Sequence, residues 1–389
     1  MKKGSVETES DRKTAKNAWF LGSSSLLNDA GGDMIAPILP FYVISMGGGG
    51  IAIGLLSGLR EGLSSVFKMF GGWFSDKLGK RKFFVFLGYL LSFIFKFFIG
   101  IANSWNQILL FVSLERFGKF RDAPRDAIIA RHLKNRGKNF GIIQMLDTIG
   151  GVIGTLIVLF LFWKFNFGFK TIIFIAAGIS FLSLFPLLFV KDVKTKPIKK
   201  SLFEGLRSLD KRLKYFVFVA TIFSFANFGL YMFLLLIARD ITGSIIYSLI
   251  FYVLFNLVFA FFVIPFGKLS DSIGRKKILF LGYSLFLLVV LGFIFFRSFA
   301  YLFVLFPLYG MVYAITHSSQ KALVSDLANS GKGTAMGFLH MSTGLASIPG
   351  GLIAGILWDI NSSWMFAYIS VVALAAIVLL SFVKEKKIG

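Results

Sequence analysis

Carboxylates stand inside long apolar runs of this sequence, where an ionised group is expensive and needs a partner or a task. Asp29 and Asp33 are four residues apart, which puts them on one face of a helix, and Asp147 and Glu61 stand in two other apolar runs. Two carboxylates in a low dielectric repel one another when both are charged, which favours proton binding by one of them. These four are therefore candidates for carrying a coupling proton. The alternative for the aspartates is a structural role, neutralised by a basic residue such as Arg60, Lys96 or Arg116.

Polar residues in other apolar runs are candidates for contacting a substrate. A guanidinium binds a carboxylate or phosphate bidentately, which points to Arg60 and Arg116. Neighbouring residues on a helix point apart, so we expect Glu61 not to pair with Arg60, nor Glu115 with Arg116. A lone histidine is more often a satisfied structural residue than a functional one. The substrate-binding candidates are Arg60, Arg116, Glu115, Asn227, Tyr231 and His317.

A short motif occurs twice. Residues 72–82 read GWFSDKLGKRK and residues 267–277 read GKLSDSIGRKK. Glycines permit a tight turn, an aspartate can accept hydrogen bonds at a helix N-terminus, and trailing cations anchor a segment to anionic lipid headgroups. The motif predicts a cytoplasmic gate or anchor in each half of the chain. Together with two arginines placed near the inner mouth, its residues are Gly72, Asp76, Gly79, Arg81, Gly267, Asp271, Gly274, Arg275, Arg121 and Arg125.

The elements that must position these residues are membrane-spanning helices. Hydrophobic residues make up 56% of the 389 residues and charged ones only 16%, against about 25% in a soluble domain. A helix of about 20 apolar residues crosses the hydrocarbon and satisfies its own backbone there. The sequence predicts twelve spans, near residues 18–44, 51–73, 83–102, 106–130, 139–162, 170–190, 215–239, 244–267, 278–297, 300–325, 333–357 and 364–383.

The repeat and the spans together predict two six-helix pseudo-symmetric halves of an all-α membrane protein. Residues 1–190 are expected to form the N-terminal half and residues 215–389 the C-terminal half. The cytoplasmic linker, residues 191–214, carries a capping-box pattern at Ser201–Glu204 followed by leucines on one helix face, which predicts an amphipathic helix on the inner membrane surface. A merely solvated linker is the alternative.

The basic residues predict the orientation and exclude other classes of protein. With the N-terminus inside, the inner segments hold most of the 42 Lys and Arg residues, whereas four lie in outer loops. This asymmetry predicts a multi-pass protein of the plasma membrane with both termini cytoplasmic. The net charge of +23 is spread over short clusters, so nucleic acid is not an expected partner. Cysteine is absent and the three histidines are isolated, so neither a metal nor another cofactor is expected.

The two motif copies resemble the loop signature of the major facilitator superfamily, and the resemblance extends over nearly the whole chain. Arg116 with Gly118 is similar to the Arg-and-Gly motif of the family's fourth helix. Gly141, Gly150 and Gly154 have the spacing of its antiporter motif, although Thr155 stands where that motif has proline. Residues 121–130 and 139–150 resemble a prokaryotic branch of the superfamily. The resemblance implies a transporter that works by alternating access of its two halves.

The sequence favours a secondary active transporter over the other classes. It has no Gly-rich ATP-binding motif, no nucleophile–base set for an enzyme and no filter sequence for a channel. The aromatic second half favours proton-coupled export of a small amphipathic or drug-like solute. The cations of the first half favour the alternative, a proton-coupled carrier of a small charged metabolite. The expected partners are a small-molecule substrate, a proton or other coupling ion and the lipid bilayer, and the expected state is a monomer; a channel or a non-transport membrane protein is a remote alternative.

Overall fold

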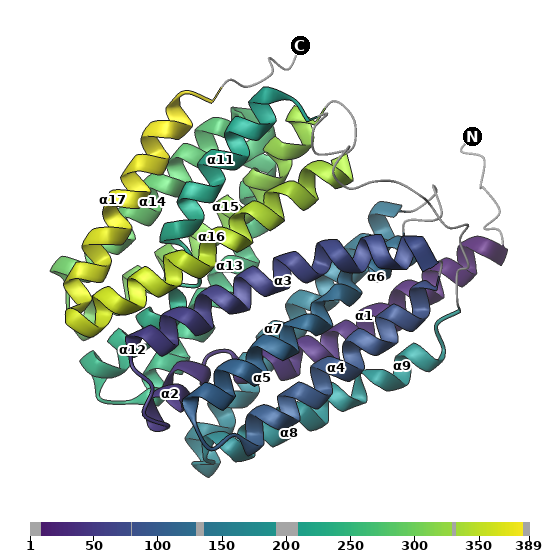
Figure 1. Ribbon diagram of the computed structural model, residues 1–389, viewed down its shortest axis with the longest axis horizontal. Helices are drawn as coiled ribbons and strands as arrows, with labels where there is room; N and C mark the ends of the chain where they lie inside the picture. The colour runs from purple at the N-terminus through teal and green to yellow at the C-terminus, as the bar shows by residue number, and fades with distance from the viewer. Residues whose placement is uncertain (1–8, 79, 130–135, 192–208, 329–331, 384–389) are drawn as a thin grey trace. The chain divides into compact units, whose positions relative to one another are not determined.

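The computed structural model describes residues 9–78, 80–129, 136–191, 209–328 and 332–383. All regular secondary structure in these ranges is helical, as predicted, and the chain forms two compact units (Figure 1). Unit 1 comprises Met1–Ala36, Phe67–Ile101 and Leu114–Lys199, and unit 2 comprises Pro37–Val66, Ala102–Ser113 and Lys200–Gly389. The predicted halves, with boundaries at residues 190 and 215, remain a prediction.

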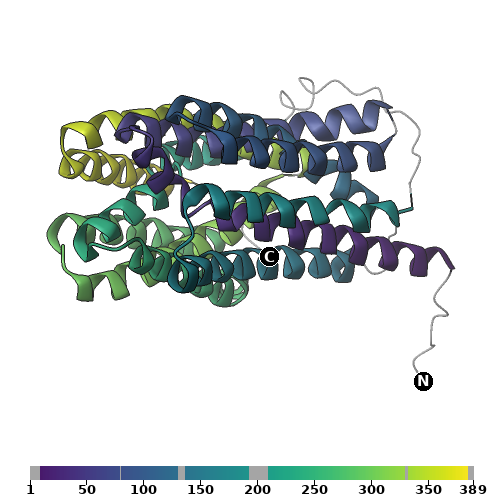
Figure 2. The same cartoon turned by 90° about the horizontal axis from the view of Figure 1, so that it is seen from below.

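Unit 1 is built around the first long helix. Helix α1 packs against α7 and α8, and α4 packs against α8 (Figure 2). The chain between α5 and α7 is broken into a 3-10 turn, η1, and a short helix, α6, both of which contact α4. The helices with residues in this unit are α1 (Glu9–Ile35), the second part of α3 (Gly50–Leu78), α4 (Arg81–Ile101), the end of α5 (Trp105–Phe117), η1 (Gly118–Arg121), α6 (Asp122–Ile129), α7 (Arg136–Phe165), α8 (Phe169–Leu182) and α9 (Leu184–Leu188).

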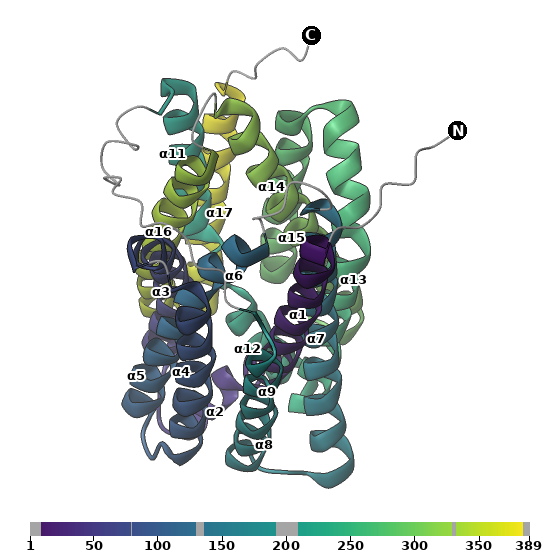
Figure 3. The same ribbon diagram turned by 90° about the vertical axis from the view of Figure 1, so that its right-hand side faces the viewer.

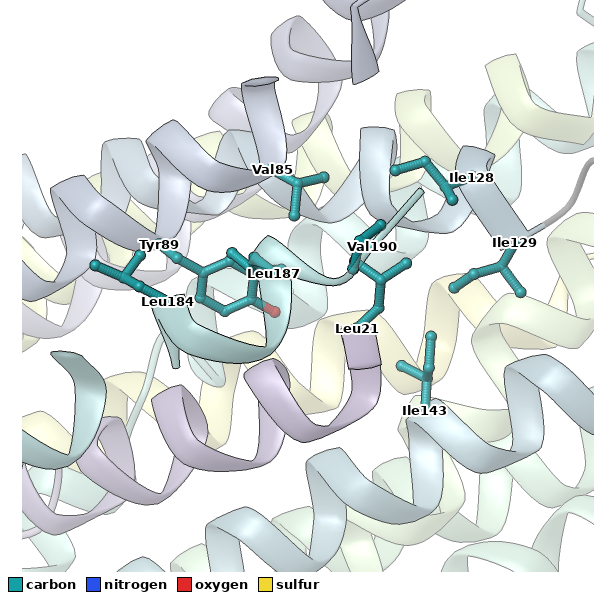
Figure 4. Packing of buried hydrophobic residues seen from close by; sticks show 9 residues of the cluster. All are labelled: Leu21, Val85, Tyr89, Ile128, Ile129, Ile143, Leu184, Leu187 and Val190. Carbon is teal, nitrogen blue, oxygen red and sulfur yellow. The ribbon is translucent and has the colours of Figure 1, made fainter. Parts of the chain in front are cut away.

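A buried apolar cluster packs helices of unit 1 against one another (Figure 4). Helices α1, α4, α6, α7 and α9 each contribute to it, so residues far apart in the sequence meet there. Its members are nearly inaccessible to solvent, which fixes the short helix α6 against the longer ones. The cluster consists of Leu21, Val85, Tyr89, Ile128, Ile129, Ile143, Leu184, Leu187 and Val190.

Unit 2 contains the second set of helices, in which α15 lies beside α13 and α14, and α11 beside α16 and α17 (Figure 3). Prolines interrupt three of these helices, at Pro265, Pro307 and Pro349. The helices of this unit are α2 (Leu39–Ser45), the first parts of α3 and α5, α11 (Lys211–Ala226), α12 (Tyr231–Thr242), α13 (Ile245–Ile273), α14 (Arg275–Phe295), α15 (Phe299–Leu327), α16 (Lys332–Ile360) and α17 (Ser362–Ser381).

Local sequence explains where several of these helices begin. The side chains of Asp210, Ser244 and Asn361 each accept a hydrogen bond from the backbone N–H two residues on, at the starts of α11, α13 and α17. Between α13 and α14 the chain turns at Gly274, whose φ of +112° strains any residue with a side chain. Backbone conformation therefore explains why the second glycine of this copy of the repeated motif, Gly274, is a glycine.

Nine helical segments in the described ranges are long and apolar enough to cross a membrane. They coincide with nine of the predicted spans: Arg81–Ile101, Ile142–Phe165, Phe169–Leu188, Lys211–Thr242, Ile245–Ile273, Arg275–Phe295, Phe299–Leu327, Gly333–Ile360 and Ser362–Ser381. The other three predicted spans, near 18–44, 51–73 and 106–130, are helical but carry many polar and charged residues, and two of them are interrupted. The count of twelve remains a prediction. The predicted linker helix lies mostly in residues 192–208, outside the described ranges.

Candidate functional site

A buried lysine joins three helices at the centre of unit 1. Lys96 of α4 is only 2% exposed. Its Nζ donates to the backbone oxygen of Asn28 at 2.9 Å, to Asn28 Oδ1 at 3.1 Å and to Ser180 Oγ on α8 at 2.8 Å. An ammonium has three N–H groups, so all three find acceptors. Gly31 makes the approach possible, because a Cβ there would collide with Ser180 and with the backbone of Ala176.

The three candidate aspartates line one seam of unit 1. Asp29 and Asp33 lie on α1, and Asp147 lies on α7, the helix that packs along α1. The carboxylate of Asp33 contacts α7 at Gly151, where an added Cβ would lie 2.7 Å from Asp33 Oδ2. Asp29 and Asp147 are within electrostatic range of one another. The structure thus brings together three of the four residues predicted for proton coupling, whereas Glu61 lies in unit 2.

The partners of these aspartates differ from those that the sequence suggested. Asp29 lies 3.9 Å from Lys119 Nζ and accepts weak hydrogen bonds from Ser25 at 3.5 Å and Asn28 at 3.4 Å. The ion pair of Asp29 in the described ranges is thus with Lys119, a residue that was not among the suggested partners Arg60, Lys96 and Arg116. Lys119 belongs to η1, between α5 and α6, where the chain is not a regular α-helix. Helical periodicity therefore does not predict that its side chain lies near Asp29 of α1.

Arg125 of α6 contacts residues of α1 and α7 at this seam and also a carboxylate of its own helix. Its Nη1 donates to Ser25 Oγ at 2.7 Å and lies 3.4 Å from Asp147 Oδ2, and its Nε pairs with Asp126 at 3.2 Å. The other carboxylate oxygen of Asp147 is buried and has no hydrogen-bond partner within the described ranges. A proton bound by Asp147 would therefore weaken its ion pair with Arg125, because a neutral carboxyl group attracts the guanidinium much less than a carboxylate does.

Two further arginines of unit 1 are held by local contacts. The side chain of Arg121 is 1% exposed; its guanidinium lies 4.3 Å from the ring centroid of Tyr89 and donates to the oxygen of Gly118 at 2.9 Å. Arg116 Nη2 and Glu115 Oε2 are 2.6 Å apart, and Ser92 donates to the other Glu115 oxygen at 2.6 Å. The expectation that Glu115 and Arg116 cannot pair is wrong. They stand at the end of α5, next to η1, and the long guanidinium side chain curls back to its neighbour.

Polar and aromatic candidates gather in unit 2. Asn227 follows α11 and accepts a hydrogen bond from the hydroxyl of Tyr309 at 2.9 Å. Tyr231 packs on Tyr252 with ring centroids 5.6 Å apart. His317 is exposed, lies against Phe259 and contacts Lys321 Nζ at 2.9 Å. Arg60 is buried on α3 at 9% exposure, and the adjacent Glu61 is exposed.

The second copy of the repeated motif forms an ion-pair network within unit 2. Arg275 at the start of α14 pairs with Asp271 of the motif and with Asp326 of α15, the latter at 3.1 Å. In the first copy, Arg81 donates to the oxygen of Ala127 at 3.1 Å. Gly72 and Asp76 lie on α3, although the position of the Asp76 side chain is not described, and Gly79 lies outside the described ranges.

Close packing between α3 and α16 was not predicted. Gly54 and Gly58 of α3 face α16 so closely that a Cβ on either would collide with the backbone near Gly351 or Ser347. At one end of this crossing, Asp359 of α16 accepts hydrogen bonds from the backbone N–H groups of Gly50 at 2.5 Å and Ile51 at 3.0 Å. The four-residue spacing of Gly50, Gly54, Gly58 and Gly62 is the sequence signal that could have revealed it.

Comparisons with known proteins decide the family. The family model described as Major Facilitator Superfamily matches residues 21–332 and, in a second match, residues 216–388. The chain belongs to the major facilitator superfamily. This superfamily member is 44% identical to an MFS-type transporter of Methanocaldococcus jannaschii over 385 residues, which cover 96% of each chain. The resemblance to a prokaryotic branch of the superfamily is thereby confirmed.

More distant relatives and solved structures agree with the fold. The superfamily member is 22% identical to the multidrug resistance protein MdtH of Sodalis glossinidius over 353 residues, covering 88% of this chain and 86% of MdtH. Its structure is similar to that of the nucleoside transporter NupG, with a TM-score of 0.78, 15% identity and coverage of 94% and 99% of the two chains. A peptide transporter solved in complex with sulfate gives a TM-score of 0.77 at 14% identity, covering 95% and 93%. The predicted all-α transporter fold is confirmed, and the protein is a multi-pass membrane transporter.

Proposed function

We propose that this transporter exports a small amphipathic solute in exchange for protons, by alternating access of its two halves. The observation that carries the proposal is the α1–α7 seam, on which Asp29, Asp33 and Asp147 lie together with Arg125 as a switchable partner. A carboxylate that can trade an ion pair for a proton couples proton uptake to a rearrangement of its neighbours. The MdtH relatives named as multidrug resistance proteins support the solute class, at 22% identity for the protein of Sodalis glossinidius.

The alternative function is transport of a small charged metabolite, for which Arg60 of unit 2 and Arg116 of unit 1 are separate candidate contacts. The pairing of Arg116 with Glu115 at 2.6 Å disfavours it, because an anionic substrate would have to displace a carboxylate already in place. Neutral or cationic amphipathic solutes meet no such competition. We propose in addition that the transporter is a monomer and that it lies in the plasma membrane with both termini cytoplasmic.

The test uses everted membrane vesicles with an imposed pH gradient, monitored by a pH-sensitive dye. We expect at least one compound from a panel of amphipathic solutes to discharge the gradient in vesicles that contain the wild-type protein. Asp33→Asn should abolish this discharge, because asparagine mimics the protonated carboxylate and cannot release a proton. The same panel applied to Asp240→Asn serves as a control, because Asp240 is a carboxylate of unit 2 outside the seam and outside the repeated motif.

Two results would count against the proposal. If small anionic metabolites discharge the gradient and amphipathic solutes do not, the alternative substrate class is correct. If Asp29→Asn, Asp33→Asn and Asp147→Asn all retain solute-dependent proton movement, the seam does not carry the coupling proton.

A further inference from the structure

An aromatic cluster of unit 2 contains four tyrosines and two phenylalanines. Phe255 of α13 stacks on Tyr309 and meets Tyr313 edge-on, with ring centroids 5.3 and 5.2 Å apart. Tyr309 and Tyr313 of α15 are themselves 5.2 Å apart, and Tyr252 extends the cluster from Phe255 to Tyr231 of α12. We call these six residues the tyrosine cluster: Tyr231, Tyr252, Phe255, Phe259, Tyr309 and Tyr313.

Glu61 of α3 belongs to the same unit, and its carboxylate is within electrostatic range of the phenols of Tyr309 and Tyr313. One turn earlier on α3, Ser57 packs against Gly229, whose positive φ of +100° places it in the break between α11 and α12. Asn227 and Tyr231 flank that glycine on either side, so α3 presents Ser57 and Glu61 to the polar end of the cluster.

Glu61 is a carboxylate of a membrane protein, in which an ionised group needs a partner. Within the described ranges it forms neither an ion pair nor a hydrogen bond. It is exposed, whereas Tyr309 is 1% and Tyr231 is 9% exposed. Tyr313 and Phe259 are partly exposed. The accessible part of the cluster thus combines aromatic rings with a carboxylate that forms no ion pair with any cation in the described part of the chain.

We propose that Glu61 and the tyrosine cluster form a binding site for an organic cation. Aromatic faces attract a cation through the ring quadrupole, and a carboxylate supplies the counter-charge. A large apolar cation also buries its hydrocarbon against the rings, which a metal ion or a small ammonium does not. The hydroxyl of Tyr309 is already committed to Asn227, so this phenol contributes its ring rather than its hydroxyl group to the cluster.

This inference narrows the solute class of the proposed function and assigns Glu61 to the solute instead of the proton. It rests on the proposed function only for the idea that the bound ligand is transported. Lys321 is a cation at the Phe259 end of the cluster, because its Nζ contacts His317, whose ring lies against Phe259. Lys321 sets the limit of the site, because a bound cation is repelled from that end.

The test compares two probes of nearly equal size and shape and of opposite charge, tetraphenylphosphonium and tetraphenylborate. Binding to the purified protein in neutral detergent is measured by equilibrium dialysis, with no gradient imposed. We expect tetraphenylphosphonium to bind saturably at one site per chain and tetraphenylborate not to compete. Glu61→Gln should weaken tetraphenylphosphonium binding about tenfold, which corresponds to a loss of about 1.4 kcal/mol.

Matched variants separate the rings from the charge. Tyr313→Phe keeps the ring and should bind as the wild type does, whereas Tyr313→Leu removes it and should weaken binding about two- to fivefold. Asp240→Asn is the control for Glu61→Gln, since Asp240 is an acidic residue of the same unit that is paired with Arg239 at 2.7 Å. It should leave the affinity unchanged. Size-exclusion profiles of the detergent-solubilised variants establish that each is folded.

The site is refuted if both probes bind equally, or if Glu61→Gln binds tetraphenylphosphonium as tightly as the wild type. If Glu61→Gln does not fold, unequal binding by the two Tyr313 variants supports the site and equal binding refutes it. These outcomes are distinct from those of the vesicle assay. Charge-selective binding that depends on Glu61 supports the site even if no solute discharges a pH gradient, and discharge by solutes that do not bind there leaves proton exchange intact and refutes the cation site.

Discussion

The contact between α3 and α16 predicts a large effect from the addition of a single methyl group. A Cβ on Gly54 would collide with the carbonyl oxygen of Gly351 and would lie 2.9 Å from its carbonyl carbon and 3.0 Å from the Cα of Gly355. All three atoms belong to the backbone, so no side chain can rotate to make room. Gly54→Ala must therefore push the two helices apart, and overpacking of this kind costs about 1–3 kcal/mol.

Gly178 of α8 is the matched control, because no atom lies within 4 Å of the Cβ position there. Gly178→Ala should be neutral or stabilise the protein by up to about 1 kcal/mol, since alanine is the better helix former. The two variants add the same methyl group to a helical glycine. Their free energies of unfolding should differ by about 1–4 kcal/mol, with Gly54→Ala the less stable.

The assay is unfolding in mixed micelles of detergent and denaturing surfactant, followed by the fluorescence of the six tryptophans. The wild type and both variants are compared at one protein concentration. If Gly54→Ala is as stable as Gly178→Ala, then α3 and α16 do not approach one another through Gly54, and the close crossing is not a feature of the folded protein.

Three further predictions concern other contacts. Asp359→Ala removes the cap from the backbone N–H groups of Gly50 and Ile51, so it should lower the free energy of unfolding by about 1 kcal/mol. It should also speed maleimide labelling of a cysteine placed at the buried Ser57, whereas unchanged labelling would show that this cap does not hold α3 against α16. Ser180→Ala removes an acceptor of the Lys96 ammonium and should lower the free energy of unfolding by about 1.5–3 kcal/mol, more than removal of a neutral hydrogen bond. Ser183→Ala is the control, because the Ser183 hydroxyl donates to the backbone oxygen of Ser180 on its own helix at 2.6 Å. Equal losses of stability in the two variants would rule out the role of Ser180. A single cysteine at Asn103 should react with an impermeant reagent from outside sealed cells and one at Lys196 only from inside, and external labelling at residue 196 would reverse the orientation.

The helices that sequence reasoning identified correctly are those in which apolar residues dominate. Composition alone determines that a run such as 278–297 spans a bilayer, and α14 (Arg275–Phe295) lies there in the structure. The predicted span at 106–130 is less regular, because Lys119 and Arg121 turn toward partners on other helices and the chain forms η1 and α6 there. The span predicted at 215–239 is broken between α11 and α12, where Gly229 takes a positive φ.

The candidate site was predicted in its residue types but not in its pairings. The four-residue spacing placed Asp29 and Asp33 on one face, and the structure adds Asp147 from a helix more than a hundred residues away in the chain. Side-chain length decided the rest, because Arg116 reaches back to its own neighbour and Lys96 reaches a backbone carbonyl of α1. Helical periodicity describes where a Cβ points and does not describe where a long side chain ends.

The prolines of unit 2 have a mechanical consequence. Pro265, Pro307 and Pro349 lie inside α13, α15 and α16, and each lacks the N–H that would bond to the carbonyl four residues earlier. A helix resists bending because a bend stretches its hydrogen bonds on one side, and at these three points one of those bonds was never present. Bending there costs less than elsewhere along the same helices. Three long elements of one unit can therefore flex at fixed positions while their hydrogen-bonded segments on either side stay rigid.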